Sequence, residues 1–105
     1  ASQWDTMLNY ILKGSDKGKV NVKTGNHTDS RASTGKFGND IMNNIFDLGS
    51  NVREWTTEAF GSFVRVQRGG NYAVDSTTPA SNRQGTYVPD TTNYVLGSRL
   101  TLYVK

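Results

Sequence analysis

The chain contains no cysteine. This absence excludes disulfide bonds, thiol nucleophiles and thiolate metal sites, and it leaves the cellular compartment open. The chain also lacks an apolar run of about 18 residues, which is the length that a membrane span needs. It opens on a helix signal rather than on a charged and apolar leader. We therefore expect no membrane span, and any export signal is absent or lies outside the chain.

Motifs of the common enzyme classes are missing too. The chain has no Gly-x-Ser-x-Gly elbow, no His-Glu-x-x-His pair, no Walker-type phosphate loop and no Gly-x-Gly-x-x-Gly. A serine triad would have to use His27, the single histidine. Asn26-His27-Thr28 is a glycosylation acceptor only if the chain is secreted from a suitable cell. A site of paired carboxylates stays open, because spacing in the sequence does not give distance in space. We expect a protein that is not an enzyme.

The basic charge of the chain is dispersed. The net charge is +3 and the pI is about 9.3. The lysines and arginines between Lys13 and Lys36 are spread through a stretch rich in Gly, Ser and Thr, with Asp16 and Asp29 between them. This spacing is typical of a solvated loop rather than of a phosphate-binding patch. We expect no nucleic-acid partner.

The composition predicts one small domain with a thin core. The apolar fraction is 34% and the mean hydropathy is −0.61, yet two Trp, five Tyr and four Phe are present. Eleven glycines and many Asn, Ser and Thr residues predict a fold dominated by turns and loops. Loops are where binding residues usually lie.

Regular periodicity is confined to three segments. Apolar residues at helical spacing, followed by Gly14, predict a helix over residues 3–13 with Trp4 as a core anchor. Alternating side chains predict strands over residues 63–68 and 100–104. Residues 15–39 have neither periodicity and are predicted as a long loop, and residues 49–55 as a turn crowded with oxygen atoms.

Residues 71–97 are rich in Tyr, Asn, Ser, Thr, Asp and Pro, with no period strong enough for a long helix. Such a composition is similar to that of an antibody combining surface, where Tyr gives contact area at low entropic cost and Ser and Asn give adaptable hydrogen bonds. The alternative is an ordinary polar connection between two strands.

Four blocks, in order, resemble the sulfatase-modifying-factor family, the formylglycine-generating-enzyme-type branch of the C-type lectin fold. Residues 1–5 (ASQWD) are similar to the family's "EAEWE", and residues 44–55 (NIFDLGSNVREW) to its "NxxGLYDMxGNVWEW". Residues 66–72 (VQRGGNY) are similar to "VxRGGSW". Residues 82–83 followed by residues 96–100 are similar to the "R…GFRL" ending. The blocks span nearly the whole chain.

The resemblance implies an α+β fold of the C-type lectin type, with a small twisted antiparallel sheet, one or two helices and long irregular loops. Residues 1–105 would form the C-terminal part of a single domain, without the family's opening strands and first helix. The strand predicted over residues 100–104 would then have an open edge, which a missing N-terminal segment or another chain covers. The chain departs from the family at Arg53, where Trp is usual, and at Ser50, where Gly is usual.

The resemblance also bears on metals. Two cysteines bind copper in the family's enzymes, and this chain has Val74 and polar neighbours in that segment, so we expect neither copper nor the oxidation. The family's calcium-type site carries over better. Asp47 and Glu54 align with its side-chain ligands, and Ser50 and Val52 with positions that offer backbone carbonyls, an all-oxygen shell that suits calcium. The alternative is that Glu54 caps the turn or pairs with an arginine.

A non-catalytic branch of this fold comprises the variable proteins of diversity-generating retroelements, which occur on phage tails and bacterial surfaces. Resemblance to that branch implies a ligand-binding module on a virion or cell surface, or otherwise extracellular, whose segment 69–97 binds a protein or glycan of a host. Arg83 and Arg99 would be buried scaffold arginines. The display positions expected are Asn71, Tyr72, Asp75, Ser81, Asn82, Gln84, Thr86 and Tyr87. The alternatives are an atypical enzyme of the sulfatase-modifying type, or a structural subunit of a virion or surface assembly.

Overall fold

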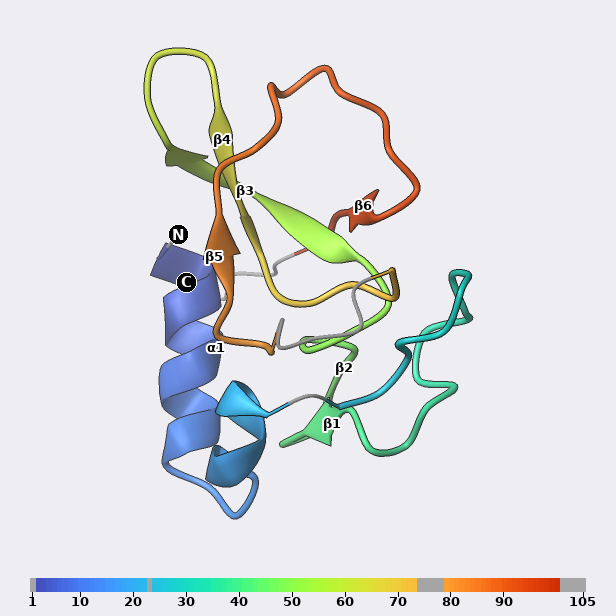
Figure 1. Ribbon diagram of the computed structural model, residues 1–105. Helices are drawn as coiled ribbons and strands as arrows, with labels where there is room; N and C mark the ends of the chain where they lie inside the picture. The colour runs from blue at the N-terminus through green and yellow to red at the C-terminus, as the bar shows by residue number, and fades with distance from the viewer. Residues whose placement is uncertain (1, 23, 74–78, 101–105) are drawn as a thin grey trace.

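The computed structural model describes residues 2–22, 24–73 and 79–100. In these residues the chain is a small α+β domain with one α-helix, two small sheets and long irregular connections (Figure 1). The elements are α1 (Ser2–Leu12), the 3-10 helix η1 (Lys17–Asn21), β1 (Ile41–Met42), β2 (Ile45–Phe46), β3 (Arg53–Ala59), β4 (Arg65–Arg68), β5 (Arg83–Gln84) and β6 (Leu96–Gly97). The expected α+β class is confirmed. None of the described helices is long and apolar enough to cross a membrane.

Helix α1 lies within one residue of its predicted bounds at each end. Its apolar stripe faces the interior, where Trp4 is 3% exposed and Ile11 is fully buried. The Trp4 indole Nε1 donates a hydrogen bond to the Ala80 carbonyl at 2.9 Å, so its polar atom is satisfied inside the core. The Gly14 amide donates to the Ile11 carbonyl at 2.9 Å just past the helix end. Trp4 is therefore the core anchor that the sequence predicts.

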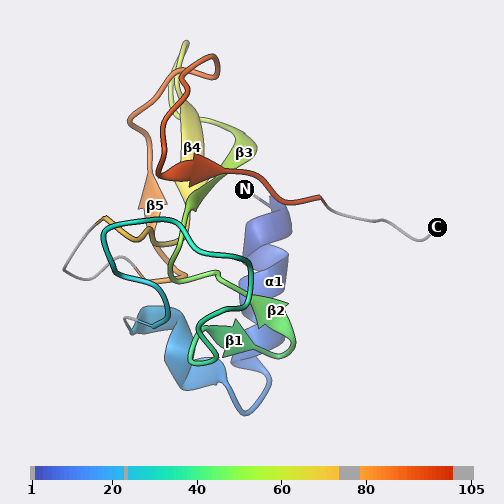
Figure 2. The ribbon, with the colours of Figure 1, turned by 90° about the vertical axis from the view of Figure 1, so that its right-hand side faces the viewer.

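The core is small and lies between α1, η1 and the residues around β1 and β2 (Figures 1 and 2). The β1–β2 pair is a tight antiparallel hairpin whose two loop residues, Asn43 and Asn44, have φ of 49° and 64°. Asn tolerates this left-handed backbone, and two such residues match the twist of a hairpin. The buried apolar residues of the cluster are Trp4, Leu8, Ile11, Val20, Met42, Leu48 and Ala80.

The larger sheet has the strand order β5-β4-β3-β6. Strands β3 and β4 form an antiparallel hairpin, β5 adds antiparallel to β4, and β6 adds parallel to β3. The sequence prediction of a turn over residues 49–55 extends too far, because β3 begins at Arg53. The buried positions at its start are Arg53 and Glu54, so no apolar alternation marks this strand.

Two strand predictions have different outcomes. The strand predicted over residues 63–68 exists as β4, but it begins only at Arg65, and Phe63 lies 78% exposed between β3 and β4. The strand predicted over residues 100–104 lies outside the described residues except for Leu100, which is fully exposed and in no strand. The predicted open edge belongs to the same segment and stays a prediction.

Candidate functional site

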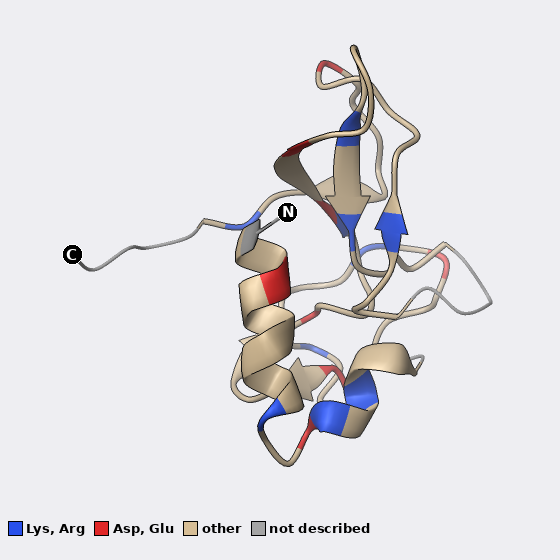
Figure 3. Cartoon of the chain, turned by 90° about the vertical axis from the view of Figure 1, so that its left-hand side faces the viewer, with Lys and Arg blue, Asp and Glu red and all other residues tan. Residues whose placement is uncertain are grey.

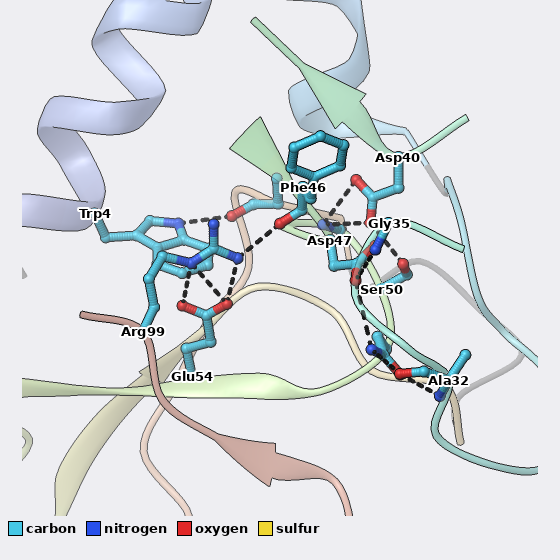
Figure 4. A network of polar contacts seen from close by, with 12 residues as sticks. Trp4, Ala32, Gly35, Asp40, Phe46, Asp47, Ser50, Glu54 and Arg99 are labelled. Atoms are coloured by element: carbon cyan, nitrogen blue, oxygen red, sulfur yellow. Dashed lines mark hydrogen bonds and ion pairs between the residues drawn. The ribbon is translucent and has the colours of Figure 1, made fainter. Parts of the chain in front are cut away.

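A buried network of polar side chains, which we call the turn network, holds residues 47–51 in place (Figure 4). The fully buried Asp40 carboxylate accepts a hydrogen bond from the Ser50 hydroxyl at 2.5 Å and from the Gly49 amide at 3.1 and 3.2 Å. A Cβ at Gly25 would collide with both Ser50 and Asp40, so glycine is required for the chain to pass here. The network consists of Asn26, Asp40, Asp47, Ser50 and Asn51.

Asn51 connects the turn network to the long loop between η1 and β1. Its Nδ2 donates to the Ala32 carbonyl, its Oδ1 accepts from the Ala32 amide, and both distances are 2.9 Å. Asp47 Oδ2 accepts from the Gly35 amide at 3.0 Å. Both Asn51 and Asp47 adopt positive φ, of 62° and 55°. The two side chains therefore fix residues 32–35 of a loop that has no regular structure of its own.

Asn26 is part of this network rather than an exposed glycosylation acceptor. Its side chain is 1% exposed, and Nδ2 donates to the Ser30 carbonyl at 2.9 Å and to Asn51 Oδ1 at 3.2 Å. The nitrogen that would carry a glycan already uses both of its hydrogens. The glycosylation reading of Asn26-His27-Thr28 is therefore wrong for the folded chain.

Glu54 pairs with Arg99, which is the alternative left open beside calcium (Figure 4). Both carboxylate oxygens of the 6% exposed Glu54 accept hydrogen bonds from Arg99, at 2.6 to 3.0 Å. Arg99 also donates from Nη2 to the Phe46 carbonyl at 2.7 Å. The resemblance predicts both scaffold arginines as buried, and Arg99, at 27% side-chain exposure, is only partly buried and contacts a carbonyl of strand β2.

The predicted calcium ligands are only partly brought together. Asp47, Val52 and Glu54 line one pocket of about 280 Å³, whereas Ser50, which was expected to offer its backbone carbonyl, does not line it. Arg99 lines the same pocket and places a cation of the chain's own against Glu54. Among the described residues there is no group of three or more His, Asp or Glu side chains arranged to hold a metal. The donor set thus fits the guanidinium better than calcium, and calcium binding stays a prediction.

Several predicted display positions have structural roles instead. Asn71 is 2% exposed and its Oδ1 accepts from the Ala73 amide, so its assignment as a display residue is wrong. Asn82 is partly buried, and its side chain donates to the Gly69 carbonyl. The partly buried Ser81 donates its amide to the Val20 carbonyl. Asp75 lies outside the described residues.

Of the remaining display positions, Gln84 lies in the edge strand β5, Thr86 and Tyr87 follow it, and Tyr72 lies before it, soon after β4. Tyr72, Gln84 and Tyr87 are partly buried, and Thr86 is exposed. Burial lowers the pKa of Arg53 in strand β3, and its interaction with Tyr87 opposes that shift.

The prediction of a buried Arg83 is wrong. Arg83 is 43% exposed, forms an ion pair with Glu58 and lies over the Phe60 ring at 5.4 Å. This pairing lowers the pKa of Glu58 to about 2.

A second pocket, which we call the loop pocket, was not predicted from the sequence. It has a volume of about 390 Å³ and is lined by Arg31, Thr92, Asn93 and Tyr94. The Arg31 guanidinium lies 5.8 Å from the centre of the Tyr94 ring, within the range of a cation–π interaction. All four lining residues are exposed, and Tyr94 is 75% exposed. The lining residues come from two loops. Both loops lie on the side of the molecule away from α1 (Figure 1).

Both halves of the loop pocket are anchored to the same short piece of chain. Arg31 precedes Ala32, which Asn51 holds through two hydrogen bonds. Tyr94 precedes Val95, whose carbonyl accepts from the Arg53 amide at 2.8 Å, next to the pairing of β6 with β3. Residues 51–53 therefore position exposed side chains from two loops that lie far apart in the sequence.

Charges elsewhere are mixed. Among the residues that the structure describes, basic and acidic side chains are interspersed, without one continuous basic band (Figure 3). This arrangement agrees with the dispersed charge in the sequence.

Comparison of the chain with protein-family models, with curated proteins and with solved structures finds no match. The class that the geometry defines is a small α+β domain with a loop-built surface pocket.

Proposed function

We propose that the chain is a non-enzymatic ligand-binding module, built on a scaffold of the C-type lectin type and related to the variable proteins of diversity-generating retroelements. The observation that carries the proposal is the loop pocket, in which Arg31 and Tyr94 are exposed side chains on loops with well-anchored backbones. Exposed aromatic and arginine side chains on a rigid support are the usual components of a binding surface. The ligand is a protein or glycan of a host or cell surface, met by the module on a virion or cell exterior.

The division between scaffold and surface supports this proposal. Asn71, Ser81 and Asn82 support the backbone, whereas residues 86–94 form a mainly exposed connection with few bonds to the core. A binding module needs such a separation, because ligand contacts then change without loss of the fold. The binding surface thus lies later in the segment 69–97 than the sequence predicts, and it includes the loop that carries Arg31.

A direct test compares the chain with Tyr94→Ala on arrays of glycans and of purified host-surface proteins. The proposal predicts that the chain binds a defined subset and that Tyr94→Ala loses this binding, because the ring supplies the main contact area. Phe63→Ser is the matched control, since Phe63 is equally exposed but lies outside the loop pocket. An array without binding, or equal binding by Tyr94→Ala, contradicts the proposal.

A structural subunit is the second candidate, and the aromatic residues between β3 and β4 favour it. Phe63 is 78% exposed and Phe60 is 50% exposed, and solvent exposure of neighbouring aromatic side chains often marks a protein contact. Sedimentation of the chain and of Phe63→Ser separates the two functions. Self-association that Phe63→Ser abolishes supports an assembly subunit, and a monomer at high concentration supports the ligand-binding module.

A further inference from the structure

We propose that the loop pocket accepts a pyranose sugar that carries a carboxylate, such as a uronic acid. This inference rests on the proposed ligand-binding function and names the class of ligand. Its first observation is the state of Arg31. Within the described part of the chain, Arg31 forms no ion pair and no side-chain hydrogen bond, and its contact is with the Tyr94 ring. Its five N–H donors are therefore available to a ligand.

The stacking on Tyr94 prepares Arg31 for an anion. A guanidinium held over an aromatic ring loses less freedom when it binds, and its planar fork matches the two oxygens of a carboxylate. Arg31 is the only charged residue among the four that line the pocket. Because Arg31 has no carboxylate partner in the pocket, it favours a ligand with one negative group next to its guanidinium.

The other three lining residues fit a sugar. Tyr94 is 75% exposed, so most of its ring surface is available to the C–H face of a pyranose. Thr92 adds a hydroxyl that can donate and accept, and Asn93, whose Oδ1 accepts from the Val95 amide at 3.0 Å, adds the two N–H donors of its amide for sugar hydroxyls. The volume of about 390 Å³ lies at the lower end of the range of small-molecule sites. An acidic peptide would be better matched by several cations than by one arginine among neutral polar groups.

The experiment is an NMR titration of the folded chain with the methyl glycosides of glucuronic acid and of glucose. These probes differ only in a carboxylate against a hydroxymethyl group. We expect amide shifts at residues 31 and 92–94, with the glucuronide bound at least about tenfold more tightly, because the charged group forms a bidentate pair. Arg31→Gln should remove this preference and keep weak binding of both sugars, while Arg31→Lys should restore only part of it.

The outcomes separate the inference from the proposed function. Equal affinity for the two sugars at the loop pocket overturns the carboxylate inference and supports the ligand-binding function. Shifts with sodium acetate or with a triglutamate peptide, but with neither sugar, overturn the sugar inference and favour a carboxylate of peptide origin. An absence of shifts with all these probes overturns the inference, and the arrays then decide the proposed function separately.

Discussion

At the scale of single residues, the pair of Glu54 and Arg99 has the clearest consequence for stability. Glu54 is buried and gives both oxygens to Arg99. Removal of one partner leaves a buried charge uncompensated, which costs about 3 kcal/mol in proteins. We expect Arg99→Met to lower the free energy of unfolding by about that amount, and the double variant with Glu54→Gln to recover part of it. Urea denaturation measures both free energies of unfolding. If Arg99→Met unfolds with the same free energy as the parent chain, the pair does not stabilise the fold.

The same pair decides the calcium prediction. A site whose Kd lies a hundredfold below the free calcium concentration would add about 2.7 kcal/mol of stability. Because Arg99 already supplies the cation at Glu54, we expect equal melting temperatures with calcium and with chelator. A clear rise with calcium, lost in Glu54→Ala, would restore the metal site that the resemblance implies.

The ion pair of Glu58 with Arg83 gives a test of stability that depends on pH. Its hydrogen bond with Arg83 lowers the pKa of Glu58 from 4.5 to about 2 in the folded chain. A group with a depressed pKa stabilises the fold above its unfolded pKa, and this contribution is lost as the pH falls. Between pH 4.5 and about 2 the chain should therefore lose stability more steeply than Glu58→Gln. Thermal melts across this range measure the difference, and parallel curves would show that the pair contributes nothing.

At the scale of elements, Asn51 is the link between the turn network and the loop that carries Arg31. Asn51→Gly keeps the positive φ without strain but removes the two hydrogen bonds to Ala32. We expect faster amide hydrogen exchange at Ala32 and little change in α1, which shares no hydrogen bond with Asn51. Exchange followed by NMR reports each amide separately. Uniformly faster exchange would mean that Asn51 supports the whole fold instead of one loop.

The elements also show where sequence reasoning succeeds and where it stops. Helix α1 was predictable because its apolar residues repeat at helical spacing around Trp4. Strand β3 was not, since the buried positions at its start are Arg53 and Glu54, and Glu54 pairs with Arg99, which is distant in the sequence. Strands β5 and β6 have two residues each, too few to show any alternation. Long elements were therefore predictable from local pattern, and short ones depend on tertiary contacts.

The candidate site was predictable only in part. The segment 69–97 was identified from its composition, and Tyr94 lies within it, but the residues chosen there included the buried Asn71. Arg31 resembles any solvated loop cation in the sequence, and no spacing rule connects it to Tyr94. Their proximity depends on Asn51 and on the pairing of β6 with β3, which only the structure reveals.

At the scale of the whole molecule, a small core supports two long loops that end at one pocket. The helix and the turn network enclose the buried residues, and the loop pocket is lined by exposed polar and aromatic side chains. On the proposed function, stability and ligand binding thus depend on different residues, whichever ligand the pocket takes.

The most direct measurement is a saturation library of the chain, scored in parallel for protease resistance and for capture on immobilised acidic and neutral glycans. We expect that substitutions in the loop pocket change capture and leave protease resistance near that of the parent chain. Substitutions in the turn network should lower protease resistance first. The contrary result, in which loop-pocket substitutions unfold the chain or leave capture unaltered, would contradict the claim.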